Sequence, residues 1–88
     1  MAASASDIAD EMTRQLCNVK AVEFIQVKSG WWGMNCWTVG NNMTQEERYL
    51  VFDSQWDVMQ RWPDVLIEFH LLDRQDRPIE YFGVQREG

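Results

Sequence analysis

The segment between Thr44 and Pro63 constrains the fold more than any other part of the sequence. Thr44-Gln45-Glu46-Glu47 matches a capping box. In this motif the hydroxyl of the first residue accepts the backbone N–H of the fourth, and the carboxylate of the fourth accepts the backbone N–H of the first. Pro63 ends the helix, because a proline disfavours helical geometry at the residue before it. Together the two signals predict one long helix in the middle of the chain.

The apolar residues of this helix fall within roughly half of its circumference at about 100° per residue, which predicts that one side packs on a core. Only Leu50 lies on the polar side, and we expect Trp56 and Trp62 to be core residues. A competing interpretation makes the segment from Arg48 to Phe52 a strand. The apolar side consists of Tyr49, Val51, Phe52, Trp56, Val58, Met59 and Trp62.

Another helix is predicted near the N-terminus, where apolar residues recur at helical spacing. Ser4 or Asp7 can cap it. Its apolar stripe is narrow, so we expect the helix to lie against the rest of the molecule on one side only. The stripe consists of Ile8, Met12, Leu16 and Val19.

Two hairpins account for the remaining segments. In the first, a strand over 21–28 leads through a two-residue turn, Ser29-Gly30, into a return strand from Trp31 to Val39. Gly33 within that strand indicates a bulge or a close backbone approach. In the second, residues 65–72 alternate with a period of two, residues 73–77 form the turn, and a last strand runs over 78–84.

The predicted order is therefore αββαββ in one α+β domain spanning residues 1–88, with frayed ends at 1–5 and 85–88. The simplest architecture is a four-stranded, mostly antiparallel sheet with two helices packed on one face.

Charge and composition exclude several classes of partner. The net charge is −6, with 14 acidic residues against 8 Lys and Arg that are scattered along the chain, so we expect no direct nucleic-acid binding. No apolar run is long enough to span a bilayer, and the N-terminal residues do not resemble an export signal. Cys17 and Cys36 are predicted to be reduced thiols rather than a disulfide. We therefore expect a cytoplasmic protein without membrane contact.

Motifs for catalysis are nearly missing. His70 is the only histidine, and it shares a predicted sheet face with Glu68. With Asp73 or Asp76 nearby these side chains make a sparse metal site, but a structural zinc site needs four ligands. We predict no catalytic residue, no metal site and no cofactor, and hence no enzyme.

The tryptophans are the unusual feature, since five occur in 88 residues and three lie close together in the predicted first hairpin. Both faces of the predicted strands carry large apolar side chains, whereas two helices cover only one face of a sheet. An exposed apolar sheet face is typical of an interaction site. The predicted interface residues are Trp31, Trp32, Trp37, Leu66, Leu72 and Phe82.

The leading hypothesis is a small acidic, non-catalytic protein-interaction module whose sheet face forms a homodimer contact or docks a protein partner. A second hypothesis is an acidic inhibitor that mimics nucleic acid and occupies a basic protein surface. A third is a small ligand-binding or metal-binding domain with Glu68, His70 and Asp73 at the mouth of a Trp-lined pocket.

Overall fold

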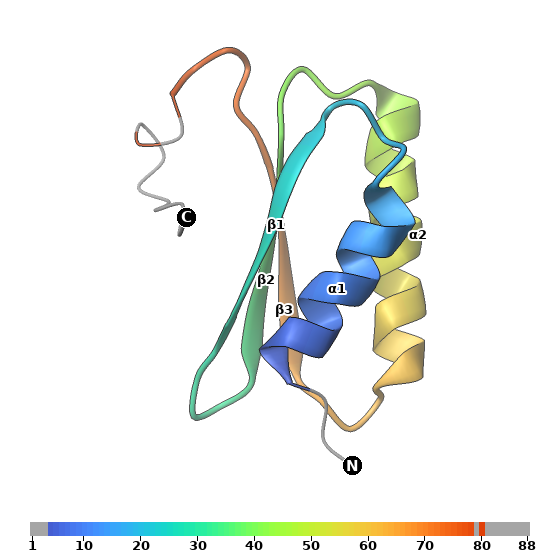
Figure 1. The fold of residues 1–88 in the computed structure, drawn as a ribbon, viewed down its shortest axis with the longest axis vertical. Coiled ribbons are helices and arrows are strands. Elements are labelled where there is room, and N and C mark those ends of the chain that lie inside the picture. Colours follow the sequence, from blue (N-terminus) through green and yellow to red (C-terminus); the bar gives the residue numbers. More distant parts are fainter. Residues whose placement is uncertain (1–3, 79, 81–88) are drawn as a thin grey trace.

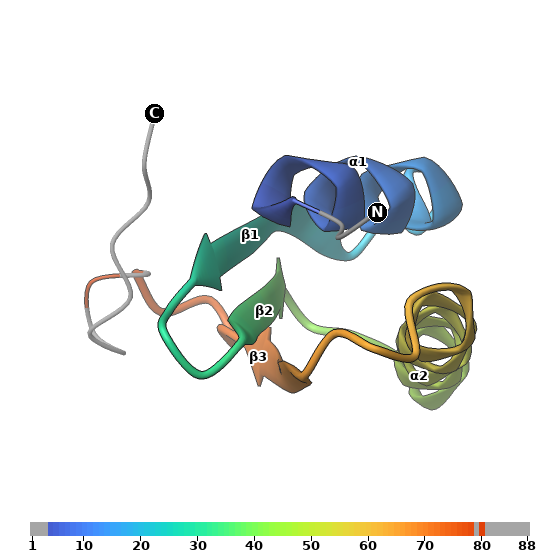
Figure 2. The same ribbon diagram turned by 90° about the horizontal axis from the view of Figure 1, so that it is seen from below.

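The computed structural model describes residues 4–78 and residue 80, and over these residues the chain forms two helices and a three-stranded sheet. The predicted α+β class is confirmed. Figure 2 shows both helices on one side of the sheet, with α1 beside β1 and α2 beside β3. In chain order (Figure 1) the elements are α1 (Ala5–Leu16), β1 (Val22–Ser29), β2 (Met34–Gly40), α2 (Gln45–Arg61) and β3 (Ile67–Asp73).

Both helices begin at capping boxes. The Thr44 hydroxyl accepts the backbone N–H of Glu47 at 3.2 Å, and the Glu47 carboxylate accepts that of Thr44 at 3.0 Å. Ser4 and Asp7 form the same pair of bonds at the start of α1. The predicted capping box at Thr44 is confirmed, and Ser4 rather than Asp7 caps α1. The competing interpretation of the segment from Arg48 to Phe52 as a strand is wrong, because these residues lie within α2.

The sheet is mixed rather than mostly antiparallel. Strands β1 and β2 form the predicted antiparallel hairpin, but β2 and β3 pair in parallel, with Met34 opposite Ile67 and Gly40 opposite Asp73. The 17-residue helix α2 returns the chain to the end of the sheet where β2 began, so β3 must run in the same direction as β2. The predicted antiparallel arrangement is wrong for this pair.

The fourth predicted strand, over 78–84, lies almost entirely outside the described residues. Pro78 and Glu80 are described, and neither is part of a strand. The predicted frayed ends likewise lie largely outside them.

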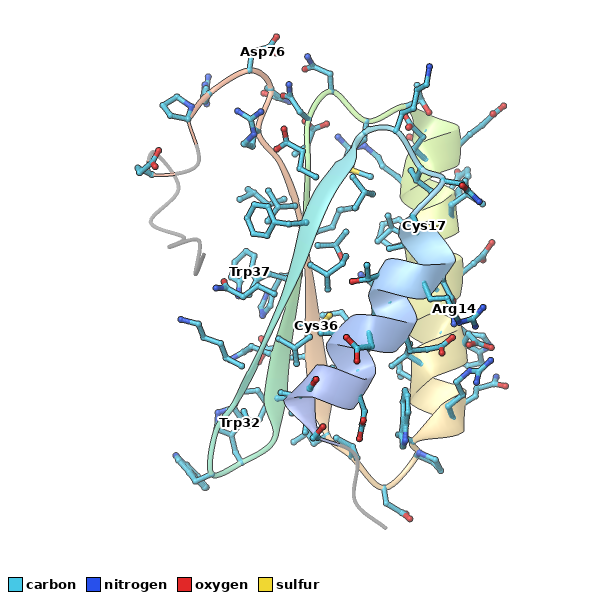
Figure 3. All side chains as sticks on the ribbon, in the orientation of Figure 1. Arg14, Cys17, Trp32, Cys36, Trp37 and Asp76 are labelled. Carbon is cyan, nitrogen blue, oxygen red and sulfur yellow. The ribbon has the colours of Figure 1, made fainter. Side chains whose placement is uncertain are left out.

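The core fills the space between the helices and the facing side of the sheet. Ile8, Met12 and Leu16 of α1 are buried there, which confirms the predicted stripe. Because neighbouring residues of a strand face opposite sides, Met34, Cys36 and Thr38 of β2 point to the helices and Trp37 points away. Figure 3 shows Cys36 and Trp37 on opposite sides of the sheet. The two cysteines are free thiols, Cys36 buried and Cys17 exposed.

Candidate interaction surfaces

The five predicted interface residues that the structure describes do not lie on one sheet face. Trp31 and Trp32 lie in the loop between β1 and β2, and Leu66 immediately precedes β3. Trp37 and Leu72 lie on the side of the sheet that the helices leave uncovered. Phe82 lies outside the described residues.

The first surface is the hairpin tip, which we define as Trp31, Trp32 and Leu66. The loop spans residues 30–33, and the Gly30 N–H donates to the Gly33 carbonyl at 2.7 Å. Trp31 is 98% exposed and Leu66 is also exposed. Figure 3 shows Trp32 at the same end of the molecule. The predicted two-residue turn is wrong, and so is the placement of Trp31 and Trp32 in a strand.

Gly33 explains why the loop is longer than predicted. It adopts φ 155°, and a Cβ atom at this position would lie 2.4 Å from the carbonyl oxygen of Leu66. That carbonyl accepts the N–H of Met34 at 2.9 Å, so the parallel ladder with β3 begins directly beside the loop. The predicted close backbone approach is confirmed. The contact fixes the hairpin tip against the segment that enters β3.

The second surface is the open sheet face, centred on Trp37 and His70. Their rings stack with centroids 4.3 Å apart and an angle of 17° between the planes. The Nε2 atom of His70 lies 3.1 Å from the Asn35 side-chain oxygen and 3.8 Å from a Glu68 carboxylate oxygen. Polar and apolar side chains share this face, with Asn35, Glu68 and His70 beside Trp37 and Leu72, so it is less apolar than predicted.

Asp73 does not join Glu68 and His70. Its side chain lies on the helix side of the sheet, where its carboxylate accepts the backbone N–H groups of Asn42 at 2.7 Å and Met43 at 3.0 Å and pairs with Arg48 at 3.0 Å. Burial alone would raise the pKa of Asp73, but these bonds outweigh it and the pKa is lowered. Asp73 therefore joins the end of β3 to the start of α2, and the predicted grouping of three side chains is wrong.

The third surface, which the sequence did not predict, is an outward stripe on α2. We define the α2 stripe as Tyr49, Phe52, Trp56 and Met59, whose exposed fractions are 57%, 47%, 62% and 45%. The helix buries Val51, Ser54 and Val58 instead. The expectation that the whole apolar half is core is therefore wrong, including for Trp56, whereas Trp62 does pack against the core.

A signal for the α2 stripe is present in the sequence. Its members follow a three-four-three spacing, which places them along one line of a helix. The buried residues form a second line, about 150° away at 100° per residue. An apolar arc wide enough to contain both lines is wider than one packing contact requires.

Several acidic side chains form ion pairs with arginines of the same chain. Glu11 pairs with Arg14, and Asp57 accepts hydrogen bonds from Arg61 at 2.7 Å and from Gln15 at 2.6 Å, which ties α2 to α1. The hydrogen bond from Arg14 holds the pKa of Glu11 down at about 2. Two further arginines pair with carboxylates, Arg48 with Asp73 and Arg74 with Glu23.

The described residues contain no group of three or more His, Cys, Asp or Glu side chains placed to hold a metal ion. Neither helix in this part of the chain is long and apolar enough to cross a bilayer.

Comparisons of the chain with family models, with curated proteins and with solved structures give no match. The function must therefore be argued from the surfaces themselves.

Proposed function

We propose that this protein is a small, non-catalytic interaction module that binds a protein partner through the hairpin tip. The observation that carries the proposal is the position of Trp31, which extends into water with 98% of its surface exposed. Large aromatic side chains contribute most of the energy at protein interfaces, and tryptophan is among the most effective anchors. Leu66, which lies against Gly33 of the same loop, provides a second exposed apolar side chain.

The rigidity of the hairpin tip supports the same conclusion. The loop is closed by its own backbone hydrogen bond at Gly30 and Gly33 and is held against the residue before β3. An anchor on a loop that is already ordered loses little conformational freedom on binding, so more of its contact energy appears as affinity. The partner's surface would offer an apolar pocket of indole size with a neutral or basic rim, because this chain carries a net charge of −6.

The acidic-mimic hypothesis has less support, because a mimic must present its carboxylates unpaired. Four of them bind arginines of the same chain, at Glu11, Asp57, Asp73 and Glu23. The ligand-binding hypothesis loses Asp73 from its predicted site. The hairpin tip remains the surface with the most exposed anchor.

The test begins with a photoreactive amino acid at position 31, which identifies any protein that contacts the hairpin tip in cells producing this chain. The purified partner is then titrated with wild type and with Trp31→Ala. We expect Trp31→Ala to weaken binding at least tenfold, since anchor residues cost about 2 kcal/mol or more when truncated. Leu50→Ala is the matched control, because Leu50 is an exposed apolar residue on α2, away from the tip. Equal affinities for wild type and Trp31→Ala would refute the proposal.

A further inference from the structure

The α2 stripe faces away from the rest of the fold. Val51, Ser54 and Val58 of α2 are buried towards the core, and the stripe lies about 150° around the helix from them at 100° per residue. Figure 2 shows α2 at the border of the molecule, with no other described element on its outer side. The four side chains of the stripe therefore stay in contact with water, each roughly half exposed.

The stripe has the size of a binding site rather than that of a single exposed residue. At about 200 Å² for a large side chain, its four members present on the order of 400 Å² of apolar surface. The largest apolar patch on a typical monomer is about 300–600 Å² and is often functional. From Tyr49 to Met59 the stripe extends about 15 Å along α2, which is about three helical turns.

The spacing within the stripe favours a helix as the occupant. Apolar residues that alternate intervals of three and four form the contact line of a coiled coil, in which each side chain inserts between residues of a facing helix. An extended peptide binds by adding a strand to the edge of a sheet, and a helix offers it no free backbone groups. The stripe therefore matches the apolar side of another helix of about three turns.

The margin of the stripe on the α1 side is acidic. Glu46 and Asp53 lie seven residues apart and about 100° and 80° from the centre of the stripe. These are the positions beside the apolar line whose charges select the partner in a coiled coil. Both residues are exposed, and neither carboxylate forms an ion pair or hydrogen bond within the described part of the chain. A complementary helix would place lysine or arginine opposite them.

The opposite margin does not offset this negative charge. Arg48 lies there, but its guanidinium already donates to the Asp73 carboxylate at 3.0 Å. Gln55, seven residues further along the same margin, is neutral. The charge available to a partner along the stripe is therefore negative on one side and close to zero on the other.

A second copy of this chain fits the stripe less well. In an antiparallel pair of α2 helices, two-fold symmetry brings each margin against the same margin of the other copy, so Asp53 would face Asp53. In a parallel pair the acidic margin would face Arg48, which Asp73 already binds. Each copy also carries a net charge of −6, so charge complementarity favours a basic partner instead.

We propose that the α2 stripe docks an amphipathic helix of a protein partner, whose apolar residues follow the same three-four spacing and whose lysines or arginines face Glu46 and Asp53. The contact area on this chain is at the lower end of the range for specific interfaces, so the complex is transient. This second surface goes beyond the proposed function and does not depend on the hairpin tip.

Two synthetic peptides test the proposal. Each has about three heptads with leucine along its apolar line, and the flanking positions are all lysine in one peptide and all glutamate in the other. Like charges on both flanks keep each peptide from pairing with itself. Fluorescence anisotropy at low ionic strength measures binding to the full chain, because salt screens exposed charges. We expect micromolar binding of the lysine peptide and binding of the glutamate peptide that is weaker by about tenfold or more.

Variants of this chain then locate the contact. Trp56→Ala should weaken binding of the lysine peptide about tenfold, whereas Leu50→Ala, at an exposed apolar residue on another side of α2, should not. Asp53→Lys should reduce the preference for the lysine peptide, and Glu46→Lys combined with Asp53→Lys should invert it. Asp10→Lys is the matched charge control, because Asp10 is an exposed carboxylate on α1, and it should keep the preference.

Several outcomes would overturn the proposal. Equal affinities for the two peptides, or wild-type binding by Trp56→Ala, would show that the stripe and its margin do not form the site. An equal effect of Asp10→Lys and Asp53→Lys would show attraction to the whole acidic chain. Light scattering that finds a dimer for wild type and for Leu50→Glu, but a monomer for Trp56→Glu, would assign the stripe to a second copy. Trp31→Ala should leave peptide binding unchanged, so this test is separate from that of the proposed function.

Discussion

Thr38→Val is expected to stabilise the protein. The Thr38 side chain is fully buried on the helix side of β2, and its hydroxyl has no hydrogen-bond partner among the described residues. Its register neighbours are the apolar residues Ile25 on β1 and Leu71 on β3. A buried polar group without a partner costs about 1–3 kcal/mol, and valine has nearly the same shape without the hydroxyl. We therefore expect the free energy of unfolding to rise by about 1–2 kcal/mol.

Urea unfolding at one fixed protein concentration measures this change, together with a thermal scan in which each 1 kcal/mol raises the Tm by about 4–8 °C. Thr38→Ser provides the control, because it keeps the hydroxyl and removes the methyl group. We expect that variant to lose about 1 kcal/mol. If Thr38→Val is less stable than wild type at an unchanged denaturant slope, the hydroxyl has a partner and the reasoning fails.

Three further predictions concern other parts of the fold. Gly33→Ala should lower the free energy of unfolding by about 1–3 kcal/mol, measured in urea, because the added Cβ meets backbone 2.4 Å away at a positive φ. The pKa of Glu11 is lowered from 4.5 to about 2, chiefly by its hydrogen bond from Arg14, so this pair stabilises the fold above pH 4.5 and the contribution is lost as the pH falls towards 2. An acid titration of Glu11→Gln should therefore show a shallower loss of stability over that range. A thiol reagent should label Cys17 in the native protein but Cys36 only after unfolding, since burial raises the pKa of Cys36 to about 12.

Local patterns were sufficient to predict the helices. A capping box involves residues only three positions apart, so Thr44 could be found as a cap without knowledge of the tertiary structure, whereas Ser4 was one of two candidates for α1. The core stripe of α1 was predicted for the same reason, because Ile8, Met12 and Leu16 lie one above another on a helix that contacts the core with one side.

The direction of β3 could not be predicted in the same way. Alternation of apolar residues over 65–72 shows that the segment is extended, but it carries no information on which strand it pairs with or in which direction. The turn after Ser29 illustrates a similar limit. The loop of residues 30–33 follows from the approach of Gly33 to Leu66, which is 33 positions away in the sequence. This approach moved Trp31 and Trp32 from a predicted strand to the hairpin tip.

The two sides of α2 show why the candidate site was only partly predictable. An apolar arc indicates that a helix packs, but not which part of the arc faces its own core. In this fold α2 contacts the core through the small residues Val51, Ser54 and Val58. Burying a large apolar side chain contributes about 1.5–3 kcal/mol, so a helix built only to stabilise the monomer would place its largest side chains there. Trp56 and Phe52 lie on the outside instead, where the monomer gains little from them.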